Sequence, residues 1–180
     1  MVIKRIAITV AAATTVALGG AAAPAFADTA VTAPNGTAYT HLHQGDTSEQ
    51  VRALQWLLTC RGFTVPTPSH FGPKTYTAVK AYQVKYQIAA DGVVGSKTWY
   101  DLVSRSQVRF GDRNDCVKGL QVLLNTYRED THSADLPITG YFGPKTQTSV
   151  HNFQGWKKLQ VSDIAGVGTW DALLTSGIGE

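Results

Sequence analysis

Apolar side chains recur along this chain with the spacing of short amphipathic helices. Three stripes follow one another between residues 45 and 104, and in each the apolar residues are three or four positions apart, so that they share one helix face. The stripes are Val51, Leu54, Leu57 and Leu58; Val79, Tyr82 and Tyr86; and Trp99, Leu102 and Val103. The pattern predicts three short helices, each with one buried face.

Polar and small residues mark where these helices begin and end. Asp46 precedes the first stripe and is expected to cap the free amides of the first turn, with Glu49 answering three residues later. Gly62 is suited to the left-handed position that ends a helix. Gly72 and Pro73 are expected to start the second helix, because the fixed φ of proline suits the first helical position.

The whole pattern is then repeated. The pentapeptide Phe-Gly-Pro-Lys-Thr stands at 71–75 and again at 142–146. The second set of stripes is Val117, Leu120, Leu123 and Leu124; Val150 and Phe153, with Trp156 as a further candidate; and Trp170, Leu173 and Leu174, with Asp112 as the expected cap. Repeats of this length are typical of duplicated supersecondary units. We therefore predict an all-α protein of two tandem three-helix units, unit 1 at 41–104 and unit 2 at 108–176, joined by too few residues for free movement.

The N-terminal residues have the features of a signal peptide. Lys4 and Arg5 precede an apolar run over 6–18 that is too short to span a bilayer, and 25–27 read Ala-Phe-Ala, as signal peptidase favours. We expect 1–27 to be removed and 28–40 to be a flexible leader. A short membrane anchor is the alternative; otherwise no membrane association is expected after cleavage.

The charge of the remaining chain disfavours nucleic acid as a partner. The full sequence has 16 Lys and Arg against 13 Asp and Glu, and loss of Lys4 and Arg5 leaves 14 against 13. Phosphate neutralisation needs clustered cations, which this near-neutral chain lacks.

Two cysteines in an exported chain suggest a disulfide. Cys60 lies late in the first helix of unit 1 and Cys116 early in the first helix of unit 2, and neither has a Cys counterpart in the other repeat. One partner from each unit predicts a link between the units, and two unpaired buried thiols are the alternative.

The combined motifs resemble the three-helix peptidoglycan-binding domain found attached to many bacterial cell-wall hydrolases and transpeptidases. The shared features are Val-x-x-Leu-Gln-x-x-Leu at 51–58 and 117–124, Phe-Gly-Pro-x-Thr, an aromatic-Gln pair at 82–83 and 153–154, and a closing Asp-Gly-x-x-Gly-x-x-Thr-Trp at 91–99. Unit 2 departs from the last motif, because Ser162 and Asp163 replace its Asp-Gly.

The resemblance implies binding of peptidoglycan, through its stem peptide or its glycan, in a shallow groove at the start of each second helix, where free backbone amides favour a carboxylate. The binding residues that it implies are Phe71, Gly72, Lys74, Thr75, Asp91, Gly92, Phe142, Gly143, Lys145 and Thr146. Because helix initiation and packing explain Gly-Pro and Phe, the side chains expected to be free for a ligand are those of Lys74, Thr75, Lys145 and Thr146. A secreted location is expected from the signal-peptide features of 1–27, and association with the cell wall from the resemblance.

Candidate catalytic and metal-ligating residues are few, and we predict no catalytic residue, metal or other cofactor. The three glutamates are Glu49, Glu129 and Glu180, and none forms an acid and nucleophile pair by its position. The five histidines, His41, His43, His70, His132 and His151, show no zinc-helix spacing.

Two alternatives to a noncatalytic binding module stay open. One is a small cell-wall hydrolase with its active site in the insertion at 128–133, and the other is a secreted partner or inhibitor of another cell-wall protein. Trp99 and Trp170 hold matched repeat positions and are expected in the core, whereas Trp56 and Trp156 are unmatched and can either face solvent or pack the units together.

Overall fold

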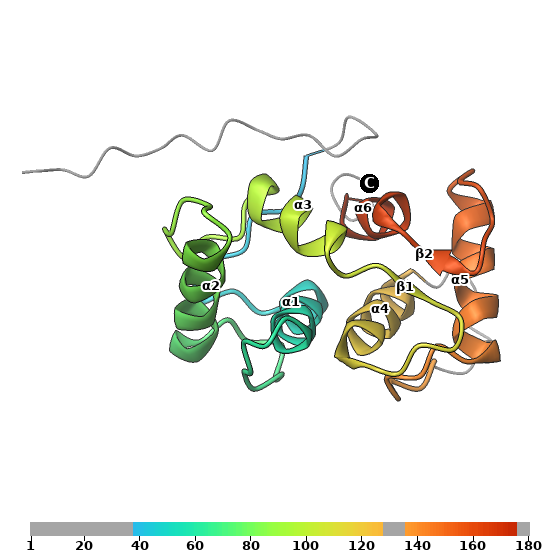
Figure 1. The fold of residues 1–180 in the computed structure, drawn as a ribbon, viewed down its shortest axis with the longest axis horizontal. Helices are drawn as coiled ribbons and strands as arrows, with labels where there is room; N and C mark the ends of the chain where they lie inside the picture. The colour runs from blue at the N-terminus through green and yellow to red at the C-terminus, as the bar shows by residue number, and fades with distance from the viewer. Residues whose placement is uncertain (1–37, 128–135, 176–180) are drawn as a thin grey trace, which may run out of the picture.

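The computed structural model describes residues 38–127 and 136–175, and it is helical as predicted. The elements are α1 (Glu49–Cys60), α2 (Pro73–Lys85), α3 (Ser96–Ser104), β1 (Val108–Arg109), α4 (Asp115–Thr126), α5 (Pro144–Trp156), β2 (Ile164–Ala165) and α6 (Val167–Thr175). Figure 1 shows the helices as two groups of three, with α1 and α4 side by side at the centre. The predicted signal peptide, most of the predicted leader and the insertion at 128–133 lie outside the described residues.

The predicted caps of the first helix in each unit are wrong by two residues. Ser48 caps α1 by accepting a hydrogen bond from the Val51 amide at 3.2 Å, and Asn114 caps α4 through the Val117 amide at 3.1 Å. Asp46 instead closes the preceding turn by accepting from the His43 amide. In unit 2, Asp112 likewise accepts a hydrogen bond from the Arg109 amide. The Asp side chain is already used one turn before the helix, so the cap is a polar residue two positions later, Ser48 or Asn114.

The proline and glycine signals were correct. Pro73 and Pro144 are the first residues of α2 and α5, each preceded by an extended glycine. Gly62 follows α1 with φ +90°, the left-handed conformation that ends a helix at low steric cost.

The predicted stripes form the core. Val51, Leu54, Leu57 and Leu58 are buried, as are their counterparts in α4. Trp99 and Trp170 are also buried, as their matched positions predicted, together with the phenylalanines of the two pentapeptides. Each unit therefore buries the same set of side chains, and the repeat is one of structure as well as of sequence.

The two units pack through α1 and α4, with α3 beside α6 (Figure 1). At the crossing, a Cβ on Gly119 of α4 would lie 3.3 Å from the Ala53 carbonyl oxygen of α1 and equally close to Leu57. Ala53 and Gly119 occupy the same repeat position, 66 residues apart. Small residues at one position of the repeat thus let the two backbones approach closely.

A disulfide joins the same pair of helices. Cys60 and Cys116 are bonded, with their Cα atoms 5.3 Å apart, which confirms the predicted link between units. Trp56 also lies at this boundary, where the Lys118 ammonium stands 4.3 Å from the centre of its ring. Trp156 behaves differently, because it is 45% exposed and packs on Tyr127, Phe153 and Lys157 of its own unit. In these interactions, Trp56 therefore contacts the other unit, whereas Trp156 contacts residues of its own unit.

The last residues of the predicted leader are packed against the helices. Tyr39 is buried, and its hydroxyl donates to the Asp171 carboxylate of α6. The Thr40 carbonyl accepts from the Trp99 indole at 3.0 Å. Residues 39 and 40 therefore belong with the folded part, and Tyr39 is a further link between the units.

Candidate functional site

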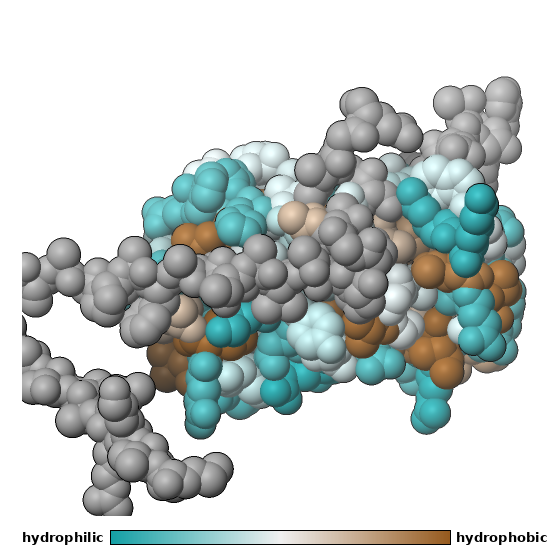
Figure 2. Space-filling view, turned by 90° about the horizontal axis from the view of Figure 1, so that it is seen from above, coloured by the Kyte–Doolittle hydropathy of each residue, from teal (hydrophilic) through white to brown (hydrophobic). Residues whose placement is uncertain are grey.

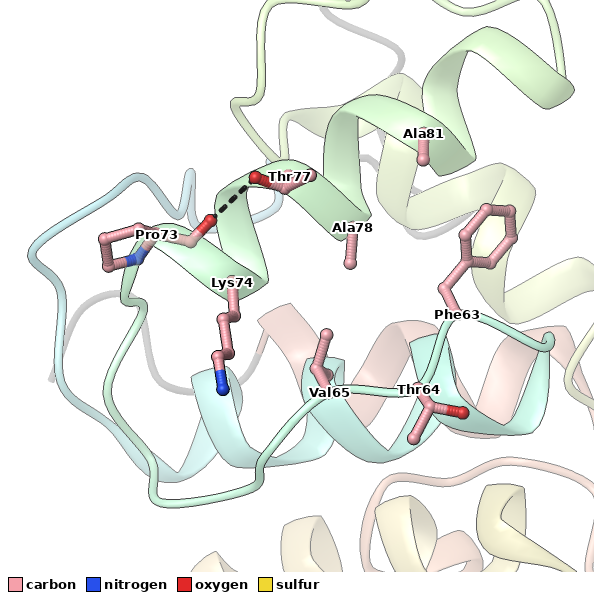
Figure 3. A pocket seen from close by; sticks show the side chains of 8 residues that line it. All are labelled: Phe63, Thr64, Val65, Pro73, Lys74, Thr77, Ala78 and Ala81. Carbon is pink, nitrogen blue, oxygen red and sulfur yellow. Dashed lines mark hydrogen bonds between the residues drawn. The ribbon is translucent and has the colours of Figure 1, made fainter.

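A groove of about 480 Å³ lies on the surface of unit 1. It lies between the first turns of α2 and the loop that follows α1 (Figure 3). Its lining residues are Phe63, Thr64, Val65, Pro73, Lys74, Thr77, Ala78 and Ala81. A hollow of this size is within the range of small-ligand sites.

Helix geometry explains the helical wall of the groove. Lys74, Ala78 and Ala81 are at positions i, i+4 and i+7 of α2, so they share one face. In Figure 3 the two methyl groups point across the groove toward the loop that carries Val65 and Phe63. A neighbouring face of α2 carries Val79 and Tyr82 into the core.

The charge of the groove is positive. Its lining contains Lys74 and no acidic residue. Lys74 is exposed, and among the described residues it has no ion pair. At the other end the Lys85 ammonium lies 5.3 Å from the Phe63 ring centre. An apolar floor between two cations suits an anionic ligand of modest size.

The expectation that Thr75 and Thr146 present free side chains was wrong. Both are buried. The Gln55 amide donates to the Thr75 hydroxyl at 3.1 Å, and the Gln121 amide donates to the Thr146 hydroxyl at 2.9 Å. The threonines therefore fasten the start of the second helix to the first, because a buried hydroxyl needs a partner.

The phenylalanines and glycines of the pentapeptides also have structural positions. Phe71 and Phe142 have no exposed surface. Gly72 and Gly143 stand directly before α2 and α5, and a Cβ on Gly143 would lie 2.5 Å from the Tyr141 ring. Of the residues implied by the pentapeptide, only Lys74 and Lys145 extend charged side chains into solvent.

Asp91 and Gly92 lie in the turn after α2, apart from the groove lining. The Gln83 side-chain amide donates to the Asp91 carboxylate and to the Val93 backbone carbonyl, and the Gly92 backbone amide donates to Gln83 Oε1 at 2.9 Å. Gly92 has φ +80° and lies against the Tyr76 ring. This explains the Gln of the aromatic-Gln motif, which holds the closing turn in place.

The corresponding turn of unit 2 is held by Gln154 and carries a polar cluster. Asp163, at the position of Gly92, accepts from the Gln147 amide at 2.7 Å and lies 2.8 Å from His151 Nε2. The hydrogen bonds from Gln147 and then His151 lower the pKa of the Asp163 carboxyl. The departure from the Asp-Gly motif is thus compensated by its neighbours.

The groove itself is also changed in unit 2. Adding 71 to the numbers of the groove residues keeps Pro144, Lys145 and Thr148, but puts Ser149 at the position of Ala78 and Asn152 at that of Ala81. Leu136 takes the place of Val65, and the counterpart of Phe63 lies outside the described residues. Among the described residues, the helical side of the groove is therefore apolar in unit 1 and polar in unit 2. A smaller polar hollow of about 180 Å³ on unit 2 lies elsewhere, around Arg113 and Tyr141.

The sequence did not indicate the apolar part of the groove. Ala78 and Ala81 are too small to stand out in a hydrophobic stripe, and the path of the loop at 63–65 depends on tertiary packing. The one usable signal was the pair of small residues four and seven positions after Lys74.

Over residues 38–127 and 136–175, no three or more His, Cys, Asp or Glu side chains gather as a metal site requires. His43 pairs with Asp46, His70 with Thr47 and His151 with Asp163.

In the same described stretches, every helix is too short or too polar to cross a membrane.

Comparison with known proteins places these two units in a family. The family described as "Putative peptidoglycan binding domain" matches residues 47–102 and 113–173. The chain belongs to this family. The two matched segments coincide with the two three-helix groups, so both units are peptidoglycan-binding domains by family.

Two curated relatives are amidases from Bacillus licheniformis. One, the N-acetylmuramoyl-L-alanine amidase CwlL, is 30% identical over 165 residues, which cover 76% of this chain and 46% of the amidase. The other, a probable N-acetylmuramoyl-L-alanine amidase, is 28% identical over 74% of this chain and 44% of its own length. The chain thus spans less than half the length of either amidase.

A third relative and a solved structure are also similar. An uncharacterized protein in the bpoA1 3′ region of Kitasatospora aureofaciens is 35% identical over 52% of this chain and 86% of its own length. The crystal structure of a peptidoglycan-binding protein from Clostridioides difficile in complex with glutamine hydroxamate is 39% identical. It covers 37% of this chain and 42% of that chain, with a TM-score of 0.37.

Proposed function

We propose that this protein is an exported, noncatalytic module that holds bacterial cell-wall peptidoglycan. The observation that carries the proposal is the groove on unit 1, in a chain whose two units both match peptidoglycan-binding domains. This groove is an open apolar hollow with a lysine at one end that has no ion pair among the described residues. A groove of this kind binds by shape and charge, and needs no reacting group.

The positions of the carboxylates support a noncatalytic role. Glu49 pairs with Arg52 and accepts from Ser69, and Asp101 pairs with Arg105 and accepts from Tyr82. Asp171 is held by Tyr39. These groups serve the fold, and none of them lines the groove.

Export is supported by the sequence of the first 27 residues and by the ligand itself, because peptidoglycan lies outside the cytoplasmic membrane. A disulfide between the units is compatible with an oxidising compartment outside the cell. We therefore place the mature protein outside the cell, in association with the wall.

The first test is binding to purified sacculi. The mature protein is mixed with sacculi at physiological ionic strength and centrifuged, and the amounts in pellet and supernatant are compared. We expect most of the protein in the pellet. A protein that stays in the supernatant over a range of sacculus concentrations would refute the proposal.

A second assay separates binding from hydrolysis. Dye-labelled sacculi are incubated with the protein, with Glu129→Gln and with a chelator. We expect no release above the buffer control in any sample. Release that is lost with Glu129→Gln would show instead that the insertion is an active site, and release that is lost with the chelator would show a metal-dependent hydrolase.

A further inference from the structure

The two units differ most in the floor of their second-helix groove. In unit 1 the floor is made of Ala78 and Ala81, with Val65 and Phe63 opposite. In unit 2 the corresponding helix positions are Ser149 and Asn152. The Ser149 hydroxyl bonds to the Lys145 carbonyl of its own helix, so this floor is polar and is already engaged. The lysine in the first turn of the second helix is present in both units, as Lys74 and Lys145.

We infer that unit 1 alone carries the binding groove, and that the groove takes a short peptide of small apolar residues whose free carboxylate pairs with Lys74. This inference rests on the proposed function and specifies which part of the wall polymer is held and by which unit.

The dimensions of the groove set the length of the peptide. Lys74 and Ala81 are seven residues apart on α2, so at a rise of 1.5 Å per residue the floor is about 10 Å long. An extended peptide covers about 3.3 Å per residue, and the floor therefore accommodates about three residues. Alanine methyl groups leave the floor shallow, which favours small side chains on the ligand.

The charge of the groove selects an anion and sets its direction. Lys74 is exposed, is without an ion pair among the described residues, and has no acidic neighbour in the lining. Lys85 at the other end is engaged over the rings of Phe63 and Tyr86. The free cation is thus at the Lys74 end, where the carboxylate is expected.

A glycan suits this groove less well. Sugar rings need hydrogen-bonding groups and exposed aromatic faces, whereas only Thr64, Lys74 and Thr77 supply polar side chains here. The Thr77 hydroxyl already donates to the Pro73 carbonyl at 3.0 Å (Figure 3). The exposed large apolar side chains of unit 2, among the described residues, are Phe110, Trp156, Val161 and Ile164, and none of them corresponds to a groove residue of unit 1. In Figure 2 the hydrophobic residues of this face lie in several patches, at both ends of the molecule and between them, among hydrophilic side chains.

The test uses the intact chain and three probes. They are N-acetyl-Ala-Ala-Ala with a free carboxylate, the same peptide as its C-terminal amide, and an N-acetylglucosamine trimer. Titration is followed by the backbone amide signals in NMR spectra. We expect the free acid to shift signals at 63–65 and 73–81 but not their counterparts in unit 2, and to bind at least threefold more tightly than the amide. Larger shifts with the trimer, or equal affinity for acid and amide, would overturn the inference.

The variants are matched between the repeats. Lys74→Gln and Ala81→Asn change exposed positions of unit 1, and Ala81→Asn gives it the residue of unit 2. Lys145→Gln is the control for the first, and Asn152→Ala for the second. We expect the two unit 1 variants to lower affinity for the free acid and retention on sacculi at least threefold, with unchanged thermal unfolding. The two unit 2 variants should match the wild type.

The two proposals fail in different ways. If the wild type binds sacculi and all four variants do so equally, the inference is wrong and peptidoglycan binding stands. If the wild type binds no sacculi but binds the free acid through unit 1, the peptide groove stands and the wall-binding function is wrong.

Discussion

The paired glutamines of α1 and α4 allow one stability prediction to be worked out in detail. Gln55 and Gln121 hold the same repeat position and are both fully buried, but their hydrogen bonds differ. The Gln121 amide donates to the Tyr141 carbonyl at 3.0 Å and to Thr146, and its carbonyl accepts from the Gly140 amide at 3.0 Å. The Gln55 amide donates to His70 and Thr75, but its carbonyl oxygen has no partner.

Replacing each glutamine by methionine keeps the length of the side chain and removes its polar atoms. At about 1 kcal/mol per hydrogen bond, Gln121→Met should lower the free energy of unfolding by about 3 kcal/mol. Gln55→Met loses about 2 kcal/mol in the same way. It also removes a buried unpaired carbonyl, whose presence destabilises the wild type by about 1 to 3 kcal/mol. The net loss for Gln55→Met should therefore be below about 1 kcal/mol, and the two variants should differ by at least about 2 kcal/mol.

Urea unfolding followed by circular dichroism measures this difference, with the disulfide kept oxidised in both variants. Equal slopes of free energy against urea are needed for the comparison, because a changed slope indicates a different unfolded or native state. If Gln55→Met is as destabilising as Gln121→Met, the carbonyl of Gln55 is satisfied in solution and the reasoning is refuted.

Three further predictions concern the contact between the units. Replacing Cys60 and Cys116 together by alanine should lower the free energy of unfolding by about 4 kcal/mol on the chain-entropy model, because the closed loop has a sequence separation of 56 residues; urea midpoints that match the oxidised wild type would contradict this. Gly119→Leu should cost about 1 to 3 kcal/mol by overpacking, since even a Cβ would lie 3.3 Å from the neighbouring backbone, and an unchanged thermal midpoint would argue against the close crossing. Burial raises the pKa of the Asp171 carboxyl, so the folded state holds the proton of this group more tightly than the unfolded state does. The free energy of unfolding should therefore fall as pH rises from about 4, the pKa in the unfolded state, to the higher pKa of the folded state. Asp171→Asn should not show this fall, and parallel pH profiles of melting temperature for the two proteins would exclude it.

The repeat made most of the fold predictable. The stripes, Pro73 and Gly62 each indicate a helix or its end through local sterics alone. The disulfide was predictable because Cys60 and Cys116 lack counterparts, and a link between units needs one partner from each. These inferences depend on short-range geometry or on comparing one repeat with the other.

The caps and the groove depended on competition that sequence does not resolve. Asp46 and Ser48 are both suitable caps, and the choice is settled by the His43 amide, which takes Asp46 first. Thr75 was expected to be free because nothing near it in sequence shows that Gln55 reaches it. The groove needed the path of the loop at 63–65, which is set by packing rather than by local preference.

The crossing of α1 and α4 has a consequence for experiments on separate units. Ala53 and Gly119 hold one repeat position and meet each other, so the two units are related as the subunits of a twofold-symmetric homodimer are, through a self-complementary surface. A unit cut from the chain would expose that apolar surface and would tend to pair with a second copy of itself. Such a fragment would then bind the cell wall as a pair with two copies of the unit. The avidity of the pair would be mistaken for the affinity of a single unit.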